Sequence, residues 1–332
     1  MVGSLIKLED LHQINVYRRH FMDVALWEPF VRQVCAAHEL VCDSVGTGLA
    51  GTCPTFVVDA RWVVKFFGKL FDGAAAFMAE LAANRLVVQE PMIPAAPLIA
   101  SGELLPHDAV WHWPYLVFEF LPGGSIGEQV EAGSLVELEK VACWIGQVIR
   151  PLHHLALTSQ SHFPASWKPF TAFLQQQVDN CVDTHRRWGT LPAHLITQIP
   201  DFMLSVTDLL DEDIVPHLIH ADLTADHLLG VVENGRFCPT GLIDFGDAMV
   251  GNILYELVAV HIDMFRCSKR LLSAFLNSYE LPGSYRDNFA AKAMCMTLLH
   301  RFDVMVGAVP HLPPVNEIES LGHLADLLWQ SG

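Results

Sequence analysis

Two runs in the second half of the chain carry residue types that could do chemistry. Residues 220–229 read His-Ala-Asp-Leu-Thr-Ala-Asp-His-Leu-Leu, so Asp222 is followed five residues later by His227. Residues 242–247 read Leu-Ile-Asp-Phe-Gly-Asp and place Asp244 after two apolar residues. Phosphoryl transfer requires one carboxylate that orients a hydroxyl group and a second that holds Mg²⁺. The two runs together therefore predict transfer of the γ-phosphate of ATP or GTP to an alcohol.

A glycine-rich segment in the first half fits the same chemistry. Residues 46–51 follow the pattern G-x-G-x-x-G, with Gly46, Gly48 and Gly51 at the glycine positions. A dinucleotide-binding fingerprint should open a helix, and a Walker loop should continue with Lys and Ser or Thr. Here Thr-Cys-Pro follows and leads into strand-like residues, which favours a glycine-rich lid between two strands whose N–H groups approach nucleotide phosphates. An ordinary glycine-rich turn is the alternative.

A single cation follows in an apolar segment. Lys65 lies among Val and Phe residues, where an unpaired charge is costly. Glu80, in the Ala-rich stretch that follows, is the expected partner, and Glu90 is a second candidate beside a proline. A strand lysine held by a helix glutamate contacts the phosphates in kinases. The alternative is a Lys65 side chain that points to solvent from the polar side of a hairpin.

The end of a later strand offers two backbone groups for a nucleotide base. Residues 118–121 read Phe-Glu-Phe-Leu. In an extended strand the carbonyl of Glu119 and the N–H of Leu121 point the same way, because they are two residues apart. They could therefore pair with an adenine edge, as the backbone of any edge strand could.

The histidines near Asp222 leave alternatives open. His220 is expected to be structural, fixing the loop through hydrogen bonds. We expect His227 to be a metal ligand or to lie next to one, although Mg²⁺ prefers oxygen ligands and is served poorly by imidazole. Either His227 binds a more tolerant ion such as Mn²⁺, or Asp226 or water takes the second-metal role, or one metal is enough.

The elements that must position these residues change in character along the chain. Apolar residues recur at helical spacing over 5–40. Residues 55–58 and 62–67 read as two strands of a hairpin, 74–89 as a helix, and 115–120 as a further strand. After the Pro-Gly-Gly of 122–124, most of the chain reads as helices, with short strands near 218–219 and 241–243.

This order predicts an α+β, two-lobed protein-kinase-like fold. We expect a β-rich, nucleotide-binding N-lobe over residues 1–121. We expect a mainly helical C-lobe over 122–332, with the catalytic loop, the metal site and an acceptor pocket.

Composition narrows the classes of partner. With 52% hydrophobic and 17% charged residues, the 332-residue chain is a well-buried globular protein. The net charge of −17 disfavours nucleic acid as a partner and suits a cationic substrate, although acidic cytosolic proteins are common. No apolar stretch approaches the roughly 20 residues that span a bilayer, so no membrane role is expected. The eight cysteines form no C-x-x-C pair, which favours a reducing, cytoplasmic location.

Taken together, these segments resemble the aminoglycoside phosphotransferase family of small-molecule kinases. The family's catalytic loop, His-Gly-Asp-Leu-x-x-x-Asn, is similar to residues 220–227, with His227 at the Asn position. Its metal motif, Asp-x-Gly followed by Gly-Asp-Pro and an acidic residue, resembles Asp244-Phe-Gly, then Gly-Asn252-Ile and Glu256. The resemblance covers residues 45–260 and implies a protein-kinase-like fold, a nucleotide and Mg²⁺, and a small hydroxylated acceptor such as an aminoglycoside or other amino sugar. The segment from Asp222 to His227 is most similar to hygromycin-type members.

Three other functions compete with this interpretation. The presence of His227 where the family has Asn would suit a nucleotide-binding pseudokinase without phosphotransfer. A protein kinase is disfavoured because four residues separate Gly246 from Gly251, which leaves no room for a peptide-binding activation loop. A divalent-metal hydrolase is a further alternative, but it would leave Lys65 and the glycine-rich segment unexplained. Its candidate ligands are His217, His220, Asp222, Asp226 and His227.

Overall fold

The chain divides into two compact units. The computed structural model describes residues 7–49, 51–107, 110–129, 135–158, 162–210 and 215–330. The first unit comprises Met1–Gln89, Ala95–Pro122 and Gly241–Asp247, and the second comprises Glu90–Pro94, Gly123–Thr240 and Ala248–Gly332. The short segment with Asp244 therefore belongs to the first unit, and the loop with Asp222 belongs to the second.

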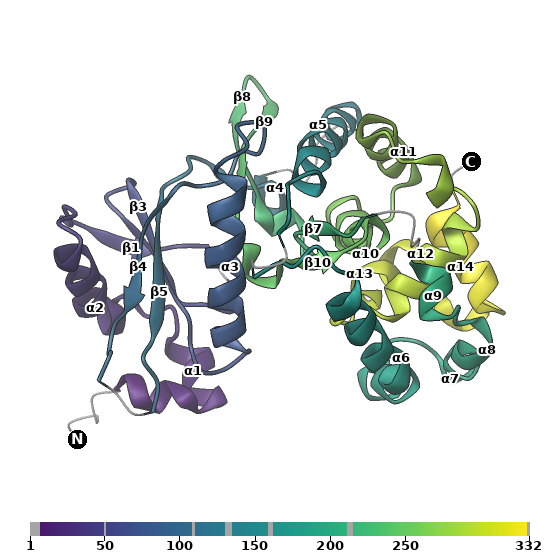
Figure 1. Ribbon diagram of the computed structural model, residues 1–332, viewed down its shortest axis with the longest axis horizontal. Helices are drawn as coiled ribbons and strands as arrows, with labels where there is room; N and C mark the ends of the chain where they lie inside the picture. The colour runs from purple at the N-terminus through teal and green to yellow at the C-terminus, as the bar shows by residue number, and fades with distance from the viewer. Residues whose placement is uncertain are drawn as a thin grey trace. The chain divides into compact units, whose positions relative to one another are not determined.

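The first unit is built on a five-stranded sheet whose neighbouring strands are all antiparallel (Figure 1). Its strand order is β1-β2-β3-β5-β4. The expected hairpin is confirmed as β2 and β3, and the expected strand at 115–120 as β5. The bounds are β1 Val45–Thr47, β2 Thr55–Val58, β3 Trp62–Phe66, β4 Leu98–Glu103 and β5 Pro114–Glu119.

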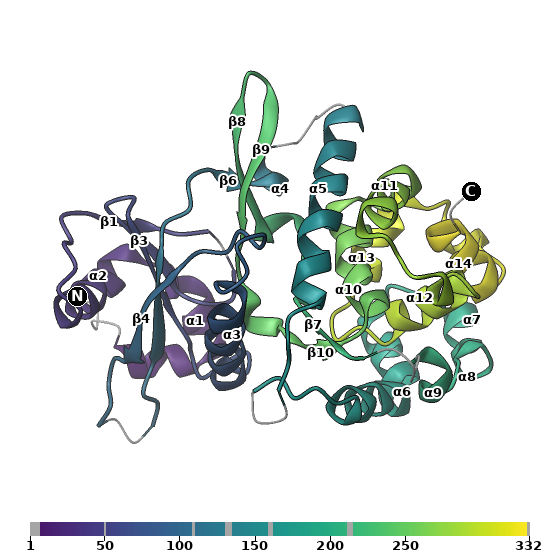
Figure 2. The same ribbon diagram turned by 45° about the horizontal axis from the view of Figure 1, so that its top comes forward.

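Alternation of side chains gives the sheet two apolar faces, which lie against different helices. Trp27 and Val31 of α2 (Val24–Ala37) pack on one face, and Phe77 and Leu81 of α3 (Gly73–Val87) pack on the other. Figures 1 and 2 show these two helices on opposite sides of the sheet. The strand residues on the α2 face include Phe56, Val64, Phe66 and Val117. Those on the α3 face include Val63, Leu116 and Phe118, together with Phe67 just after β3.

The N-terminal helical stretch is broken into three pieces. They are the 3₁₀ turn η1 (Leu8–His12), α1 (Ile14–His20) and α2. Asp23 interrupts the run, since its carboxylate accepts a hydrogen bond from Ala25 N at 3.0 Å and caps α2. The sequence predicted helical character over 5–40 but missed this break, because apolar periodicity continues across it.

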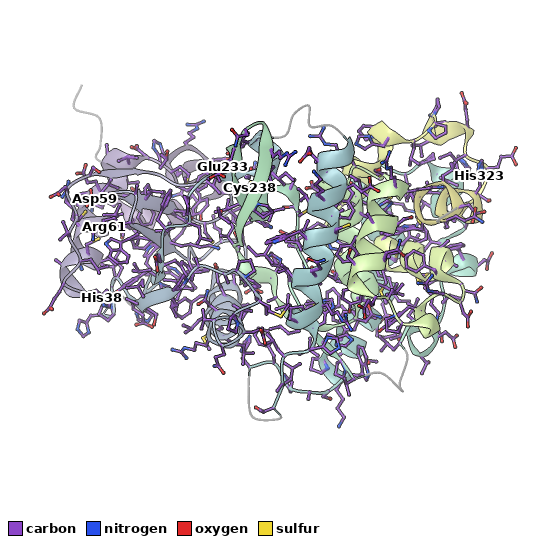
Figure 3. The ribbon with its side chains drawn as sticks, turned by 90° about the horizontal axis from the view of Figure 1, so that it is seen from above. His38, Asp59, Arg61, Glu233, Cys238 and His323 are labelled. Atoms are coloured by element: carbon purple, nitrogen blue, oxygen red, sulfur yellow. The ribbon has the colours of Figure 1, made fainter. Side chains whose placement is uncertain are left out.

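The second unit is mainly helical and carries two small sheets. The longest helices are α5 and α6, and Figure 1 shows α5 beside α11. β7 pairs antiparallel with β10, and β6, β8 and β9 form the other sheet. Figure 3 marks Glu233 and Cys238 on the β8–β9 hairpin. The bounds are α4 Ile126–Gln129, α5 Leu135–His153, α6 Lys168–Trp188, α7 Ala193–Ile196, α8 Ile199–Phe202, α9 Val206–Leu209, α10 Ile253–Ala259, α11 Lys269–Tyr279, α12 Phe289–Leu298, α13 Met305–Ala308, α14 Leu321–Trp329, β6 Gly124–Ser125, β7 His217–Ile219, β8 Leu228–Glu233, β9 Arg236–Leu242 and β10 Met249–Gly251.

The expected α+β class is confirmed by a β-sheet unit and a helical unit. The sequence did not indicate β4, whose Ser, Gly and Glu residues weaken a strand pattern. It is a strand because its backbone pairs with β5 across a register shift near Ile99. Within the described part of the chain, none of the helices combines the length and the apolar character needed to cross a bilayer.

Candidate functional site

The first unit holds a lysine between two carboxylates. Lys65 lies on β3, on the face covered by α3, because side chains alternate along the strand. Its Nζ atom donates to Glu80 Oε2 at 2.7 Å and to Asp244 Oδ1 at 2.8 Å. Lys65 and Glu80 are 6% and 3% exposed. The predicted ion pair between Lys65 and Glu80 is confirmed, and Asp244 is a second partner that the sequence did not indicate.

Two opposing effects set the charge of Lys65. Burial alone would lower the pKa of its ammonium group, because an apolar setting disfavours the charged form. The carboxylates of Asp244 and Glu80 outweigh burial, and the pKa of Lys65 is raised. The side chain is therefore a permanent cation at a fixed position, which suits contact with a polyphosphate.

The segment that carries Asp244 approaches α3 closely. Asp244 adopts a left-handed conformation (φ +63°), and its Oδ1 atom also accepts from Gly246 N at 3.4 Å. A Cβ atom at Gly246 would lie 3.2 Å from Asp244 Oδ1 and 3.6 Å from Ala76 Cβ, so the glycine permits the approach. The Asp244 side chain is 35% exposed, and its carboxylate offers the hard oxygen that Mg²⁺ prefers. Asp244 therefore fits the expected metal chemistry.

The glycine-rich segment links β1 to β2, as expected of a lid between two strands. A Cβ atom at Gly48 would lie 2.8 Å from the Thr55 side chain, so only glycine fits where Gly48 N donates to Thr55 O at 2.8 Å. Gly46 and Gly51 face open space, and Ala50 lies outside the described residues. The contact with Thr55 thus explains why position 48 is a glycine, whereas Gly46 and Gly51 leave the backbone around them accessible.

Glu119 and Leu121 lie where β5 ends. The pairing of β3 with β5 runs as far as Trp62 and Glu119, and Glu119 N donates to Pro97 O at 2.9 Å. Leu121 comes just after this ladder and packs on the apolar cluster of the α3 face, which Phe67 and Leu116 share. Apolar side chains and the end of a strand are suitable neighbours for a nucleotide base, and the base contact itself stays a prediction.

In the second unit, a buried and an exposed carboxylate hold the loop that carries Asp222. The loop follows β7, and Glu256 of α10 accepts from His220 N at 2.6 Å and from Ala221 N at 3.2 Å. Asp263, on the π-helical turn η4 (Val260–Met264), accepts from Ala225 N at 2.7 Å. Glu256 is fully buried, and although burial alone would raise the pKa of its carboxyl group, His153, His220 and the loop amides lower it. An ionised Glu256 therefore fixes the backbone immediately before Asp222.

Asn252, which stands where the family that the chain resembles has Asp, has a structural role. Its Oδ1 accepts from Tyr255 N at 3.1 Å and caps α10, while its Nδ2 donates to Leu209 O at 3.3 Å. A carboxylate could make the first of these contacts and could not donate the second. Asn252 therefore ties α10 to the end of α9.

The backbone of Ala221 is strained. Ala221 adopts a left-handed conformation (φ +65°) at a position where the family that this chain resembles has glycine. This conformation costs a non-glycine residue about 1–2 kcal/mol, part of which is offset by the lower entropy of unfolded Ala relative to Gly. We expect Ala221→Gly to raise the free energy of unfolding by about 0.5–1 kcal/mol in urea titrations. Ala142→Gly, inside α5, should instead lower it by about 1 kcal/mol. Lower stability of Ala221→Gly would contradict the argument.

His227 is held by its own loop. Its Nδ1 atom is hydrogen-bonded to the carbonyl oxygen of Asp222 and lies 3.2 Å from Thr224 Oγ1. The ring stacks on that of His220 at 5.6 Å, and His220 is fully buried, in keeping with the structural role expected for it. Among the residues described, no group of three or more His, Cys, Asp and Glu side chains is arranged to hold a metal. Metal binding by His227 stays a prediction.

Further histidines are buried in the second unit. His153, at the end of α5, has its Nδ1 2.8 Å from the Tyr279 hydroxyl and its Nε2 3.9 Å from Glu256. It stacks on His217, whose Nδ1 is 2.7 Å from the His153 carbonyl oxygen. Burial lowers the pKa of His217, His261 and His300 to about 4, and neighbouring His153, Lys269 and Arg301 respectively contribute to the lowering.

The lowered pKa values of His217, His261 and His300 predict that the protein loses stability in mild acid. The unfolded chain binds these protons near pH 6.5 and the folded chain only near pH 4, so the stabilisation is present above pH 6.5 and lost as pH falls toward 4. We expect each histidine to lower the free energy of unfolding by about 1–2 kcal/mol between pH 7 and pH 5. Urea titrations should show a shallower pH dependence for His261→Gln. His323→Gln, at the exposed position marked in Figure 3, should keep the wild-type slope, and equal slopes for all three proteins would contradict the assignment.

A cavity of about 910 Å³ lies among α6, α8 and α9 of the second unit. Trp167, Met203 and Leu204 supply apolar surface, and Thr171 and Gln175 supply polar groups. Its volume lies in the range of small-molecule pockets, roughly 300–1,000 Å³. The lining suits a molecule with both apolar and hydrogen-bonding groups.

Comparison with known proteins identifies relatives by sequence. A model of the phosphotransferase enzyme family matches residues 54–290. The chain is also 24% identical over 205 residues to "Lysine-specific demethylase JMJ21" of Arabidopsis thaliana. That match covers 51% of this chain and 22% of the plant protein, so the chain spans about a fifth of the length of this relative.

Solved structures share the fold. The GDP complex of wild-type aminoglycoside 2'-phosphotransferase-IIIa has a TM-score of 0.61 at 17% identity, over 87% of this chain and 96% of that one. The streptomycin–ATP–APH(2")-IIa ternary complex has a TM-score of 0.57 at 16% identity, over 89% and 97%. A thermostable mutant of APH(4)-Ia with ADP and hygromycin B has a TM-score of 0.52 at 16% identity, over 90% and 97%. These likenesses confirm the expected kinase-like fold.

Proposed function

The chain belongs to the phosphotransferase enzyme family, and from this premise we propose that it transfers the γ-phosphate of ATP or GTP to a hydroxyl group of a small molecule. The observation that carries the proposal is the buried Lys65 held by Glu80 and Asp244. A buried cation is costly unless it is paired, and keeping one beside an ordered, partly exposed carboxylate suits the binding of a metal–polyphosphate complex.

The first unit supplies the groups for the nucleotide. In this proposal Lys65 contacts the phosphates and Glu80 fixes its position. Asp244 is the oxygen ligand of Mg²⁺, which neutralises the charge of the phosphates when it is bound. The accessible backbone of Gly46 and Gly51 approaches the phosphates, with Gly48 shaping the loop.

The base contact would come from the end of β5. We assign the carbonyl of Glu119 and the N–H of Leu121 to an adenine edge, since Glu119 is the last paired residue of the strand and Leu121 follows the ladder. The apolar cluster around Phe67 and Leu116 would lie beside the base. Guanine has a donor and an acceptor at this edge in the opposite order from adenine. The choice between ATP and GTP therefore depends on the local backbone geometry at Glu119 and Leu121.

The second unit supplies Asp222 for the acceptor. Its carboxylate would orient the attacking hydroxyl and accept its proton late, since phosphoryl transfer needs little help from a base. The hydrogen bonds from His220 N and Ala221 N to Glu256 keep the loop in place for this role. The oxygen–phosphorus bond to the acceptor forms as the bond to the nucleotide diphosphate breaks.

The acceptor class follows from charge and fold. An amino sugar is the first candidate, because the structurally similar complexes contain streptomycin and hygromycin B and this chain carries a net charge of −17. All eight cysteines are free, which suits the reducing, cytoplasmic location that we propose.

A screen of nucleotide consumption tests the proposal. ATP or GTP would be supplied with Mg²⁺ or Mn²⁺ and a panel of aminoglycosides and polyols, and products would be identified by mass. We expect at least one acceptor to raise nucleotide consumption about tenfold or more above background and to gain one phosphate. Nucleotide binding detected by thermal shift, with no phosphorylated product from any acceptor, would instead support the nucleotide-binding pseudokinase.

A further inference from the structure

Two cysteines of the first unit lie close together where α2 ends. Cys35 is in the last turn of α2 and is buried in the apolar cluster of that face of the sheet, and the partly exposed Cys42 packs against the same cluster. Between them the chain turns back on the helix, because Leu40 N donates to Cys35 O at 2.9 Å and Glu39 adopts a left-handed conformation (φ +55°). The turn therefore brings Cys42 alongside the end of α2.

Arg32 holds Cys42 over one face of α2. Its guanidinium donates to the carbonyl oxygen of Cys42 and to that of Asp43, the latter at 3.2 Å, and lies 3.8 Å from Cys42 Sγ. Glu28, one turn earlier, accepts from the same guanidinium at 2.7 Å and fixes its position. Arg32 and Cys35 are three residues apart, so their side chains share a face of the helix. The sulfur of Cys42 therefore lies over the face that carries Cys35.

Their surroundings give the two thiols different reactivity. Burial raises the pKa of the Cys35 thiol to about 12, and electrostatic repulsion from Cys42 and a hydrogen bond to Cys42 add to the increase. Cys35 therefore stays protonated near neutral pH. A dissolved oxidant reaches Cys42 first, because Cys42 is partly exposed whereas Cys35 is 1% exposed. Cys35 is then the neighbouring thiol that can react with an oxidised Cys42.

We propose that Cys35 and Cys42 form a modification site, at which hydrogen peroxide converts the two thiols into an intramolecular disulfide. The Cys42 sulfur attacks the peroxide, so an S–O bond forms as the O–O bond breaks, and one water leaves. The Cys35 sulfur then attacks the resulting sulfenic acid, so the S–S bond forms as the S–O bond breaks, and the hydroxide leaves with the Cys35 proton as a second water. The two thiols are oxidised, the peroxide is reduced, and a thiol reductant reverses the reaction.

The segment that carries Cys42 is already fixed on its other side. The carboxylate of Asp59, in the turn between β2 and β3, accepts from Asp43 N at 2.9 Å and from Ser44 N at 2.7 Å. The disulfide would therefore link α2 covalently to the residues that lead into β1. Neither cysteine is among the groups assigned to the nucleotide or the acceptor, so this oxidation does not depend on the proposed phosphotransfer.

The test exposes the reduced whole protein to hydrogen peroxide, alkylates the remaining thiols and identifies disulfides by mass spectrometry without reduction. Cleavage after Arg32 and Glu39 places Cys35 and Cys42 on separate peptides. We expect these two peptides to be joined by a link that dithiothreitol breaks. In glutathione redox buffers the equilibrium constant for this disulfide should be about tenfold or more larger in the folded protein than in urea, because the fold holds the thiols together.

Substitutions separate the roles of the two thiols. In Cys35→Ser the sulfenic acid on Cys42 has no neighbouring thiol, so dimedone should label it more strongly than in the wild type. In Cys42→Ser the buried Cys35 should stay a thiol. Cys35→Ala should give the same result as Cys35→Ser, which excludes an effect of a buried hydroxyl group. Cys238→Ser is the matched control, since Cys238 is also partly exposed and lies on the β8–β9 hairpin marked in Figure 3, and it should form the disulfide as the wild type does.

Three results would overturn the proposal. The first is that Cys42 forms links to other cysteines as often as to Cys35 in the folded protein. The second is equal labelling of Cys42 by dimedone in the wild type and in Cys35→Ser. The third is an equilibrium constant in urea as large as that in the folded protein, which would show that the fold does not bring the two thiols together.

Discussion

Asp222→Asn should reduce kcat for the acceptor identified by the screen by about 10³-fold, because the neutral side chain orients the attacking hydroxyl less well and gives its proton no acceptor. The amide has the same size as the carboxylate but cannot take the proton of the attacking hydroxyl. The loop should keep its conformation, because Glu256 holds it through the backbone N–H groups of His220 and Ala221. The dissociation constant of the nucleotide, measured by calorimetry, should therefore stay within about threefold of the wild type.

The control for this prediction is Asp183→Asn. Asp183 lies on α6 with 81% of its side chain exposed, and the substitution changes the net charge by the same amount. It should turn over at the wild-type rate. A rate for Asp222→Asn above one tenth of the wild type, with the same product, would show that Asp222 does not orient the acceptor.

The local sequence pattern was enough to predict the pairing of Lys65 with Glu80 in the first unit. An isolated cation in an apolar strand requires a partner, and the next helix offered Glu80 fifteen residues later. The alternation of side chains on β3 and the packing of α3 on that same face bring the two together. This pairing depends on short-range features that a single sequence contains.

The second partner of Lys65 could not be predicted in this way. Asp244 is 179 positions from Lys65, and it contacts Lys65 because residues 241–247 return to the first unit. No periodicity or turn pattern encodes that return. The resemblance to a kinase family indicated that Asp244 binds a metal but not that its carboxylate pairs directly with Lys65.

The sequence indicated only some of the residues that hold the Asp222 loop in place. Family resemblance marked Glu256 as an acidic position, and the structure adds that it binds the loop backbone. Asp263 belongs to none of the motifs that the sequence showed, yet its Oδ1 accepts from Ala225 N. The π-helical turn that presents Asp263 depends on an irregular backbone, which apolar periodicity does not reveal.

Lys65→Met should remove nucleotide binding and also destabilise the fold. Methionine fills a similar volume but leaves Glu80 buried without its cation, and breaking a buried ion pair in this way costs about 3–5 kcal/mol. Saturating ATP at about 100 times Kd should stabilise the wild type by about 2.7 kcal/mol. We expect no such gain for Lys65→Met in urea titrations with ATP and Mg²⁺ or Mn²⁺.

A second substitution separates the two effects of Lys65→Met. In Lys65→Met/Glu80→Met the buried carboxylate is gone, and apolar replacement of a buried pair is often neutral, so about 2 kcal/mol or more of the lost stability should return. Asp244 remains, but its partly exposed side chain can be solvated. Nucleotide binding should not return, because the phosphates still lack their cation. Lys69→Met, at an exposed position in the loop after β3, should behave as wild type in both assays, whereas ATP stabilisation of the double variant would show that Lys65 does not contact the phosphates.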